Sequence, residues 1–419
     1  MTARRLTAVD AQTYWMSASV PSDQFLIYAF GQGTTDLDDA LREVRERARA
    51  CDNMRLRIED SGFWTYPGWV PREVAGDQFV VHDLDNPTWA GCLDAVAALD
   101  ADQLSARVLT WRLHIFPCIG GLPNGTRSGT VAVLQISHAL ADGILASALA
   151  ARLFGRDDDV PTVTATPTRP ASVPVLALQA VRTHRRLVRD TESGSVPPQA
   201  HSRPVLQTNR RPEGQRRLRT VVCERHRVGG PTVTVGVLAA ISAALAAHLR
   251  ELGDAPSQLG AEVPMAKSGP RRSNNHYANV GVGLYPDAEI GRRVQLIAAD
   301  LAARRRRAAH PAMCAEAAAF AAVPAPLLRW GVQQFDPNVR WDTAIGNTVV
   351  SSVNRGRADL RFGDSPVQLT TGLLGLSPMM GMTHGVHGIG DTVTVSVYAA
   401  DSSIGDIDAY VERLADELR

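Results

Sequence analysis

TVAVLQISHALADGILASALAARLFG, residues 130–155, contains two apolar runs joined by a short polar segment. The first run alternates apolar residues and predicts a buried strand. The second is rich in Ala and Leu at helical spacing and predicts a helix. The segment between them reads SHALADG, so His138 would stand at the end of a strand. Asp142 followed by Gly143 suits a tight turn that begins a helix.

A histidine at the end of a strand is fixed by the sheet behind it, and here a carboxylate follows at short range. An imidazole held in this way is what a general base requires. We therefore identify His138 as the candidate catalytic base, supported by Asp142 and Gly143. A lone histidine at a strand end is more often structural than catalytic, so the assignment depends on the surrounding sequence and not on the residue type.

Length and composition describe a globular protein of two domains. The chain has 419 residues, more than one ordinary core accommodates, with 45% hydrophobic and 21% charged residues. A net charge of +1 gives no support for nucleic acid as a partner. The five cysteines are widely spaced and include no CxxC pair, which favours a reducing compartment and argues against a structural metal.

The N-terminus lacks an apolar signal segment, so we expect a cytoplasmic location. The longest apolar run, residues 233–249, is shorter than a bilayer span and predicts a buried helix.

Both halves of the chain mix predicted strands and helices, which indicates an α/β fold. Residues 1–155 would form the first half and residues 218–419 the second. Between them, residues 156–217 are rich in Pro and Arg and predict a crossover linker. Within this linker, LALQAVRTHRRLVRD predicts one short helix.

The pattern H-x-x-x-D-G at His138 resembles the signature of the chloramphenicol acetyltransferase superfamily. That superfamily includes condensation domains and the bacterial wax ester synthase/diacylglycerol acyltransferase family, which this chain resembles most. RLTAVDAQTYW around Asp10 is similar to that family's N-terminal signature, and the segment from Trp111 to His138 is similar in order. GAEVPMAKSG, HYANVGVGLYP and TVVSSVNRG resemble further family segments, so the resemblance covers nearly the whole chain.

The departures from the family pattern concern the secondary motifs. Ser137 stands where the family has a first histidine, and the proline of its Pro-Leu-Trp motif is missing before Trp111. The family's Asn-Asp pair falls on Thr234 and Val235, and its SNVPGP segment becomes residues 351–356, SSVNRG. These changes put wax esters and triacylglycerols in doubt as products more than they do the reaction class.

The resemblance implies two chloramphenicol-acetyltransferase-like subdomains of mixed sheet and helices around a central channel. It implies acyl transfer from a coenzyme A thioester, or from a phosphopantetheinyl acyl carrier protein, to a hydroxyl or amine acceptor. His138 would deprotonate this acceptor, a hydrophobic alcohol or a polyol, and no bound cofactor or metal would be needed. Lipid substrates would favour peripheral contact with the inner face of a membrane.

The resemblance also suggests residues that contact substrate. Asp142 would pin the loop by pairing with an arginine. Asn354, Ser351 and Ser352, near the end of a second-half strand, would stabilise the oxyanion. His384, with His387 in MTHGVHGIGD, would line the pocket or a turn; the H-x-x-H spacing admits metal as an alternative. The predicted substrate-binding set is Ser137, Trp111, Asn354, Ser351, Ser352 and His384.

Two other readings remain open from the sequence. A binding or scaffold protein could retain this fold without turnover, as the loss of the first histidine at Ser137 would permit. An enzyme of condensation or cyclisation could use the same channel. Dependence of product formation on a thioester donor separates these readings from acyl transfer.

Overall fold

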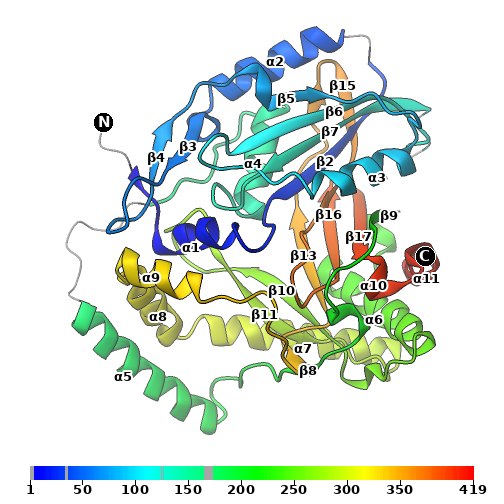
Figure 1. The fold of residues 1–419 in the computed structure, drawn as a ribbon. Coiled ribbons are helices and arrows are strands. Elements are labelled where there is room, and N and C mark those ends of the chain that lie inside the picture. The colour runs from blue at the N-terminus through cyan, green and yellow to red at the C-terminus, as the bar shows by residue number, and fades with distance from the viewer. Residues whose placement is uncertain (1–3, 34–35, 124, 126, 165–172) are drawn as a thin grey trace.

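The computed structural model describes residues 4–33, 36–123, 125, 127–164 and 173–419. Two six-stranded sheets form its framework, one in the upper and one in the lower part of Figure 1. Each sheet mixes parallel and antiparallel neighbours, and helices cover its outer face. The predicted mixed α/β fold of two subdomains is therefore confirmed, whereas a channel between them stays a prediction.

The first sheet has the strand order β14-β15-β2-β7-β6-β5. Helix α4 packs against β2 and α2, because its small and apolar residues form one buried face. A three-stranded sheet, β1-β4-β3, lies beside this half. The elements are β1 (Arg4–Arg5), α1 (Ala8–Met16), β2 (Gln24–Phe30), α2 (Leu37–Arg49), β3 (Leu56–Glu59), β4 (Gly68–Pro71), β5 (Phe79–Val81), α3 (Trp89–Leu99), β6 (Trp111–Gly120), β7 (Ser128–Ile136) and α4 (Gly143–Leu153).

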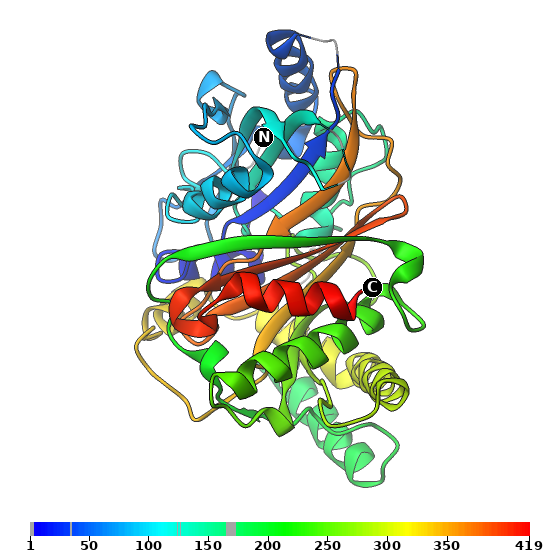
Figure 2. The same cartoon turned by 90° about the vertical axis from the view of Figure 1, so that its right-hand side faces the viewer.

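The second sheet has the order β11-β10-β13-β16-β17-β9. Its apolar face packs against α6, α7 and α11 in one core cluster. The elements are β9 (Arg216–Glu224), α6 (Val233–Glu251), β10 (Gly260–Ala266), β11 (Tyr277–Gly283), α7 (Ile290–Ala308), α8 (Pro311–Ala321), α9 (Ala325–Gln333), β13 (Thr348–Asn354), β16 (Met382–Ile389), β17 (Thr392–Ala400), α10 (Asp401–Ile404) and α11 (Ile407–Glu417). Figure 2 shows β9 and α11 running across this half.

One segment of the second half of the chain belongs to the first sheet. Strands β14 (Arg361–Phe362) and β15 (Ser365–Leu373) follow β13 in sequence but belong to the first sheet, where β15 pairs antiparallel with β2. The division by sequence, which placed all of 218–419 in the second half, therefore differs from the structure here. The alternation of apolar residues in β15 predicts a strand but does not say which sheet accepts it. This arrangement brings the end of β13 against the first half.

The segment between the halves contains more structure than its composition predicted. Helix α5 (Val173–Glu192) has 20 residues, longer than the short helix expected there, and packs against α8 at the periphery (Figure 1). Leu187 is its only buried residue. The short strand β8 (Arg203–Pro204) then pairs with β12 (Thr343–Ala344).

Helix α6 is long and apolar enough to cross a membrane, but 72% of its most apolar window is buried inside the protein. It is the buried core helix that the sequence predicted. Helices α8 and α9 pass the same test only when taken together, and they meet at a bend of 97°.

Candidate functional site

His138 lies in the turn directly after β7, where the first half meets the loop 271–276 of the second half. Its Nδ1 is 2.7 Å from Asn275 Oδ1. The Asn275 amide is oriented by its own Nδ2, which donates to His138 O at 2.8 Å and to Asp10 Oδ1 at 3.0 Å. Both of those atoms are acceptors, so the Asn275 oxygen must face the imidazole.

This orientation fixes the tautomer of His138. An amide oxygen only accepts, so Nδ1 carries the proton and Nε2 holds the lone pair. The Tyr277 hydroxyl is 3.4 Å from Nε2. Burial lowers the pKa of His138, while the Asn275 bond and the charges of Asp142 and Asp10 act in the opposite direction. The imidazole is therefore neutral near pH 7, with Nε2 ready to accept a proton.

Asp10 anchors this arrangement from the first turn of α1. Its carboxylate accepts bonds from the backbone N–H groups of Asn274 and Asn275, at 3.0 and 2.9 Å, and from the Thr7 hydroxyl at 2.8 Å. Burial raises the pKa of Asp10, and these hydrogen bonds partly offset the rise. His138, Asn275 and Asp10 thus form a continuous hydrogen-bonded chain between residues far apart in sequence.

Asp142 anchors the same loop at a second point. It caps the N-terminus of α4 by accepting from Leu145 N, and its two oxygens receive both terminal nitrogens of Arg271 at 2.9 and 3.1 Å. His276 N also donates to it at 2.9 Å. Both partners of the Asp142–Arg271 pair are almost fully buried. Removing one partner of such a pair typically costs about 3–5 kcal/mol, so the pair holds the two halves in register.

The loop 271–276, RRSNNH, is the part of the site that the sequence reasoning missed. It supplies Arg271, Asn274 and Asn275, none of which is among the residues predicted for the site. Its run of polar residues between β10 and β11 was the available signal. The contacts themselves span more than 120 residues and leave no local pattern.

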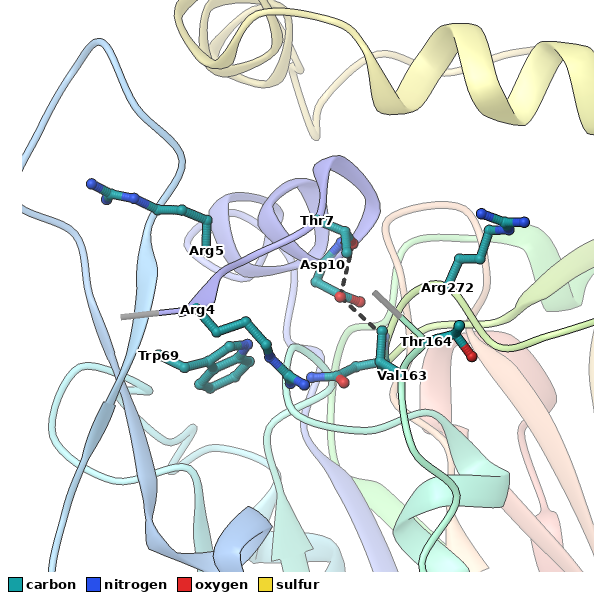
Figure 3. Close-up of a pocket in the computed structure, with 9 residues that line it drawn as sticks. Arg4, Arg5, Thr7, Asp10, Trp69, Val163, Thr164 and Arg272 are labelled. Atoms are coloured by element: carbon teal, nitrogen blue, oxygen red, sulfur yellow. Dashed lines mark hydrogen bonds between the residues drawn. The ribbon is translucent and has the colours of Figure 1, made fainter. Parts of the chain in front are cut away.

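A hollow of about 240 Å³ lies beside Asp10 (Figure 3). Three arginines contribute to its wall, together with Asp10 and Asn274 of the network that holds His138. Arg4, Arg5 and Arg272 are exposed, so their guanidinium groups are accessible to an anion. The lining residues are Arg4, Arg5, Thr7, Asp10, Trp69, Val163, Thr164, Arg272 and Asn274.

Two predicted substrate contacts lie in the core instead. Trp111 is fully buried and donates its indole N–H to Met54 O at 2.8 Å. His384 is fully buried in β16, between the Thr348 hydroxyl at 2.8 Å and the Tyr410 hydroxyl at 2.7 Å. The alternation of a strand predicts burial but not which of two faces meets the substrate, and these side chains occupy faces that pack against helices and loops.

Two of the predicted oxyanion donors, Ser352 and Asn354, have hydrogen-bond partners elsewhere. Ser352 is bonded to Thr234 of α6 at 2.9 Å, and the exposed Asn354 accepts from Gly356 N. Strand alternation places Ser351 on the other face of β13, together with Val353. A Cβ built on Gly143 would lie 3.4 Å from Val353 Cγ2, so Gly143 is the point at which the catalytic turn meets β13.

Ser137 is buried, and its backbone bonds to Thr110 O and Leu140 N hold the turn. His387 is buried on the face of β16 opposite His384, so the H-x-x-H pair does not share a ligand site. Within the described ranges, no cluster of three or more His, Cys, Asp or Glu side chains is arranged to hold a metal ion.

Comparison with solved structures places this architecture among acyltransferase folds. The chain is similar to the wax ester synthase/diacylglycerol acyltransferase from Marinobacter aquaeolei VT8, with 18% identity, coverage of 99% of this chain and 98% of that one, and a TM-score of 0.65. It is also similar to a starter condensation domain of rhizomide synthetase RzmA in complex with C8-CoA, with 15% identity, coverage of 100% and 95%, and a TM-score of 0.59. No family model and no curated protein sequence matches the chain. The predicted resemblance is thus confirmed at the level of the fold.

Proposed function

We propose that this chain, which has the fold of wax ester synthases and condensation domains, transfers an acyl group from a thioester to a hydroxyl or amine acceptor. The observation that carries the proposal is the fixed tautomer of His138. Asn275 holds the Nδ1 proton, so the lone pair on Nε2 is directed away from the anchoring network. A base oriented in this way contributes about 10²–10⁴-fold to a proton-transfer step.

The reaction balances without a bound cofactor. His138 Nε2 takes the proton of the acceptor hydroxyl or amine as the acceptor oxygen or nitrogen attacks the thioester carbonyl. The tetrahedral intermediate then collapses with cleavage of the C–S bond. The imidazolium returns its proton to the departing thiolate, which leaves as a free thiol. The products are an ester or amide and the thiol of coenzyme A or of a carrier protein.

Tyr277 is the hydroxyl best placed to assist this step. It lies 3.4 Å from Nε2, and burial, the largest cause, raises its pKa to about 12. It therefore stays protonated and can donate to the developing oxyanion or to the leaving sulfur. Ser352 and Asn354 are less well placed for this role, because their hydrogen bonds are with Thr234 and Gly356.

We assign the donor's phosphates to the hollow beside Asp10. Arg4, Arg5 and Arg272 give it a positive wall, and arginine is well suited to phosphate oxygens. Coenzyme A and a phosphopantetheinyl carrier share the phosphate-bearing arm that such a wall would bind. The acceptor remains the less defined substrate, and a hydrophobic alcohol or a polyol fits the proposed chemistry.

We further infer that the chain acts in the cytoplasm and touches the inner face of a membrane. The support is α5, which exposes valines and Leu178 together with Arg182, Arg185 and Arg189. A basic amphipathic helix of this kind binds anionic lipid surfaces. The protein should therefore sediment with vesicles containing phosphatidylglycerol and not with phosphatidylcholine vesicles; equal behaviour with both would contradict this inference.

The experiment for the proposed activity follows thiol release from a panel of acyl-coenzyme A donors in the presence of alcohol and amine acceptors. Release should depend on both substrates and should fall by at least about 10²-fold in His138→Ala. Undiminished release in that variant would overturn the proposal. Donor binding without release across the panel would instead favour the alternative of a binding or scaffold protein. Product formation that needs no thioester donor would favour a condensation or cyclisation reaction in the same site.

A further inference from the structure

Arg355, directly after β13, buries its guanidinium between the two sheets, with 6% of the residue exposed. No carboxylate among the described residues lies within ion-pairing distance of it. Among the described residues, its Nη1 donates to the Thr370 hydroxyl and, at 3.5 Å, to Ile27 O, and the Tyr28 hydroxyl also interacts with the guanidinium. Its Nε has no hydrogen-bond partner among these residues, as is also true of several other arginines. Burying a cation without compensating partners costs several kcal/mol, so this arrangement requires an explanation.

Arg293 offers an internal comparison, because among the described residues it is the other arginine buried without a carboxylate partner. Arg293 is 8% exposed, and every nitrogen of its guanidinium donates to a backbone carbonyl. The hydrogen-bonding groups of its guanidinium are therefore satisfied by the backbone of the protein. Arg355 is buried to a similar extent, but some of its guanidinium N–H groups have no acceptor among the described residues. These groups are available to donate to an anion.

The groups around Arg355 converge on one point. A Cβ on Gly372 would lie 2.8 Å from Phe25 O, 3.2 Å from Arg355 Nη2 and 3.2 Å from His387 Cε1, so a side chain here would clash with the neighbouring strand and crowd both polar groups. His387 Nδ1 is buried without a hydrogen-bond partner. Tyr28 lies under the guanidinium, with its ring centroid 4.9 Å from the central carbon, which stabilises the cation. A guanidinium and an imidazole thus face the same small region.

This cluster lies near the proposed catalytic turn. Arg355 follows Val353 by two residues, a distance of roughly 7 Å along an extended chain. The Val353 side chain is the one that approaches Gly143 at the start of α4. A substrate whose reactive end is at His138 could therefore extend along β13 toward Arg355.

We propose that Arg355 and His387 form a binding site for a substrate carboxylate, located at the far end of the acyl chain or on the acceptor. The proposal deepens the acyltransferase assignment and rests on it. A carboxylate can accept two hydrogen bonds from the guanidinium fork and one from His387, and its charge compensates the buried cation. The site thus selects substrates that carry an acidic group away from the reacting carbonyl or nucleophile.

The experiment measures binding by calorimetry without turnover, using two matched pairs of probes. Succinyl-coenzyme A against butyryl-coenzyme A tests a carboxylate on the acyl chain, and hydroxyhexanoate against hexanol tests one on the acceptor. In one pair, the acidic member should bind the natural protein about tenfold more tightly or better. The pair that shows this preference identifies which substrate carries the carboxylate.

Arg355→Met should abolish the preference, and Arg355→Lys, which keeps the charge but loses the fork, should reduce it partly. Replacing an uncompensated buried charge by a hydrophobic residue should not lower the midpoint of thermal unfolding. If Arg355→Met fails to fold, the comparison rests on Arg355→Lys. A natural protein that shows no charge preference in either pair overturns the site, as does a preference that survives unchanged in both variants. Because binding is measured without turnover, loss of the site and loss of the proposed activity are separate outcomes.

Discussion

His138 is partly buried and His384 is fully buried, and both are held by hydrogen bonds, but their surroundings differ in kind. The two nitrogens of His384 face Thr348 and Tyr410, and burial lowers its pKa to about 3. Only Nδ1 of His138 is engaged by the anchoring amide, and the bond to Tyr277 at Nε2 is long. Burial of a histidine is therefore no sign of function, and the assignment of His138 rests on its fixed Nδ1 and its available Nε2.

The largest expected effects follow from exchanging each ring for a methyl group. His138→Ala should reduce acyl transfer about 10²–10⁴-fold and change the free energy of unfolding by no more than about 1 kcal/mol. His384→Ala should do the reverse. It leaves the buried Tyr410 hydroxyl without its partner and opens a cavity, while the Thr348 hydroxyl keeps its bond to Met382 O, so we expect a loss of about 2–4 kcal/mol with little change in activity per folded molecule.

Denaturant unfolding and steady-state rates measured on the same preparations check both halves of this comparison. If His138→Ala were the more destabilised variant while keeping its rate, the assignment of the two rings would have to be exchanged. Equal losses of stability in both variants, with no loss of rate, would leave neither ring a chemical role.

The sequence predicted one side of this contrast well and the other poorly. The alternation before His138 and the turn signal at Asp142 located a strand end and a helix start, because both are local properties of the chain. The same periodicity in β16 predicted a strand-like environment for His384 but could not say which face packs against α11. The partners Asn275 and Asp10 come together only through the tertiary fold, so no spacing in the sequence reveals them.

The place of β15 in the first sheet could not be predicted for the same reason, because it depends on tertiary contacts. Its apolar pattern fits either sheet, and only the pairing with β2 decides its place. The consequence for function is direct, since this crossover carries Thr370 and Gly372 to Arg355. Comparison with the family pattern showed that residues 351–356 are altered. The role proposed for Arg355 could be inferred only from its buried surroundings in the structure.

A smaller effect should come from Asp10, which acts on His138 through Asn275. The charge of Asp10 raises the pKa of His138 against the larger effect of burial. Asp10→Asn removes that charge, so the pKa of His138 should fall further and the acid limb of the kcat/KM profile should move to lower pH. Because a weaker base transfers protons less well, the plateau should drop by about 3–10-fold.

Thr7→Ala is the matched control for Asp10→Asn, because it removes one hydrogen bond to the same carboxylate and keeps the charge. It should cost about 1 kcal/mol as a lost helix cap and leave the acid limb in place. An acid limb that is unmoved in Asp10→Asn, or that moves to higher pH, would show that Asp10 only holds the loop.

The smallest expected effect is that of Tyr277→Phe, and its sign opposes that of Asp10→Asn. In the resting site the Tyr277 hydroxyl can donate only to the neutral form of His138, at Nε2, which disfavours protonation of the ring. Removing the hydroxyl should therefore raise the pKa of His138 and shift the acid limb to slightly higher pH. The rate should fall by a few-fold to about tenfold if the hydroxyl also assists the oxyanion or the leaving sulfur.

The control is Tyr285→Phe, which removes a hydroxyl that is bonded to Asp300 in the second half. It should change neither the acid limb nor the rate. A shift of the acid limb to lower pH in Tyr277→Phe would mean that the hydroxyl accepts from the ring, and the lone pair of His138 would then have to be reassigned from Nε2 to Nδ1.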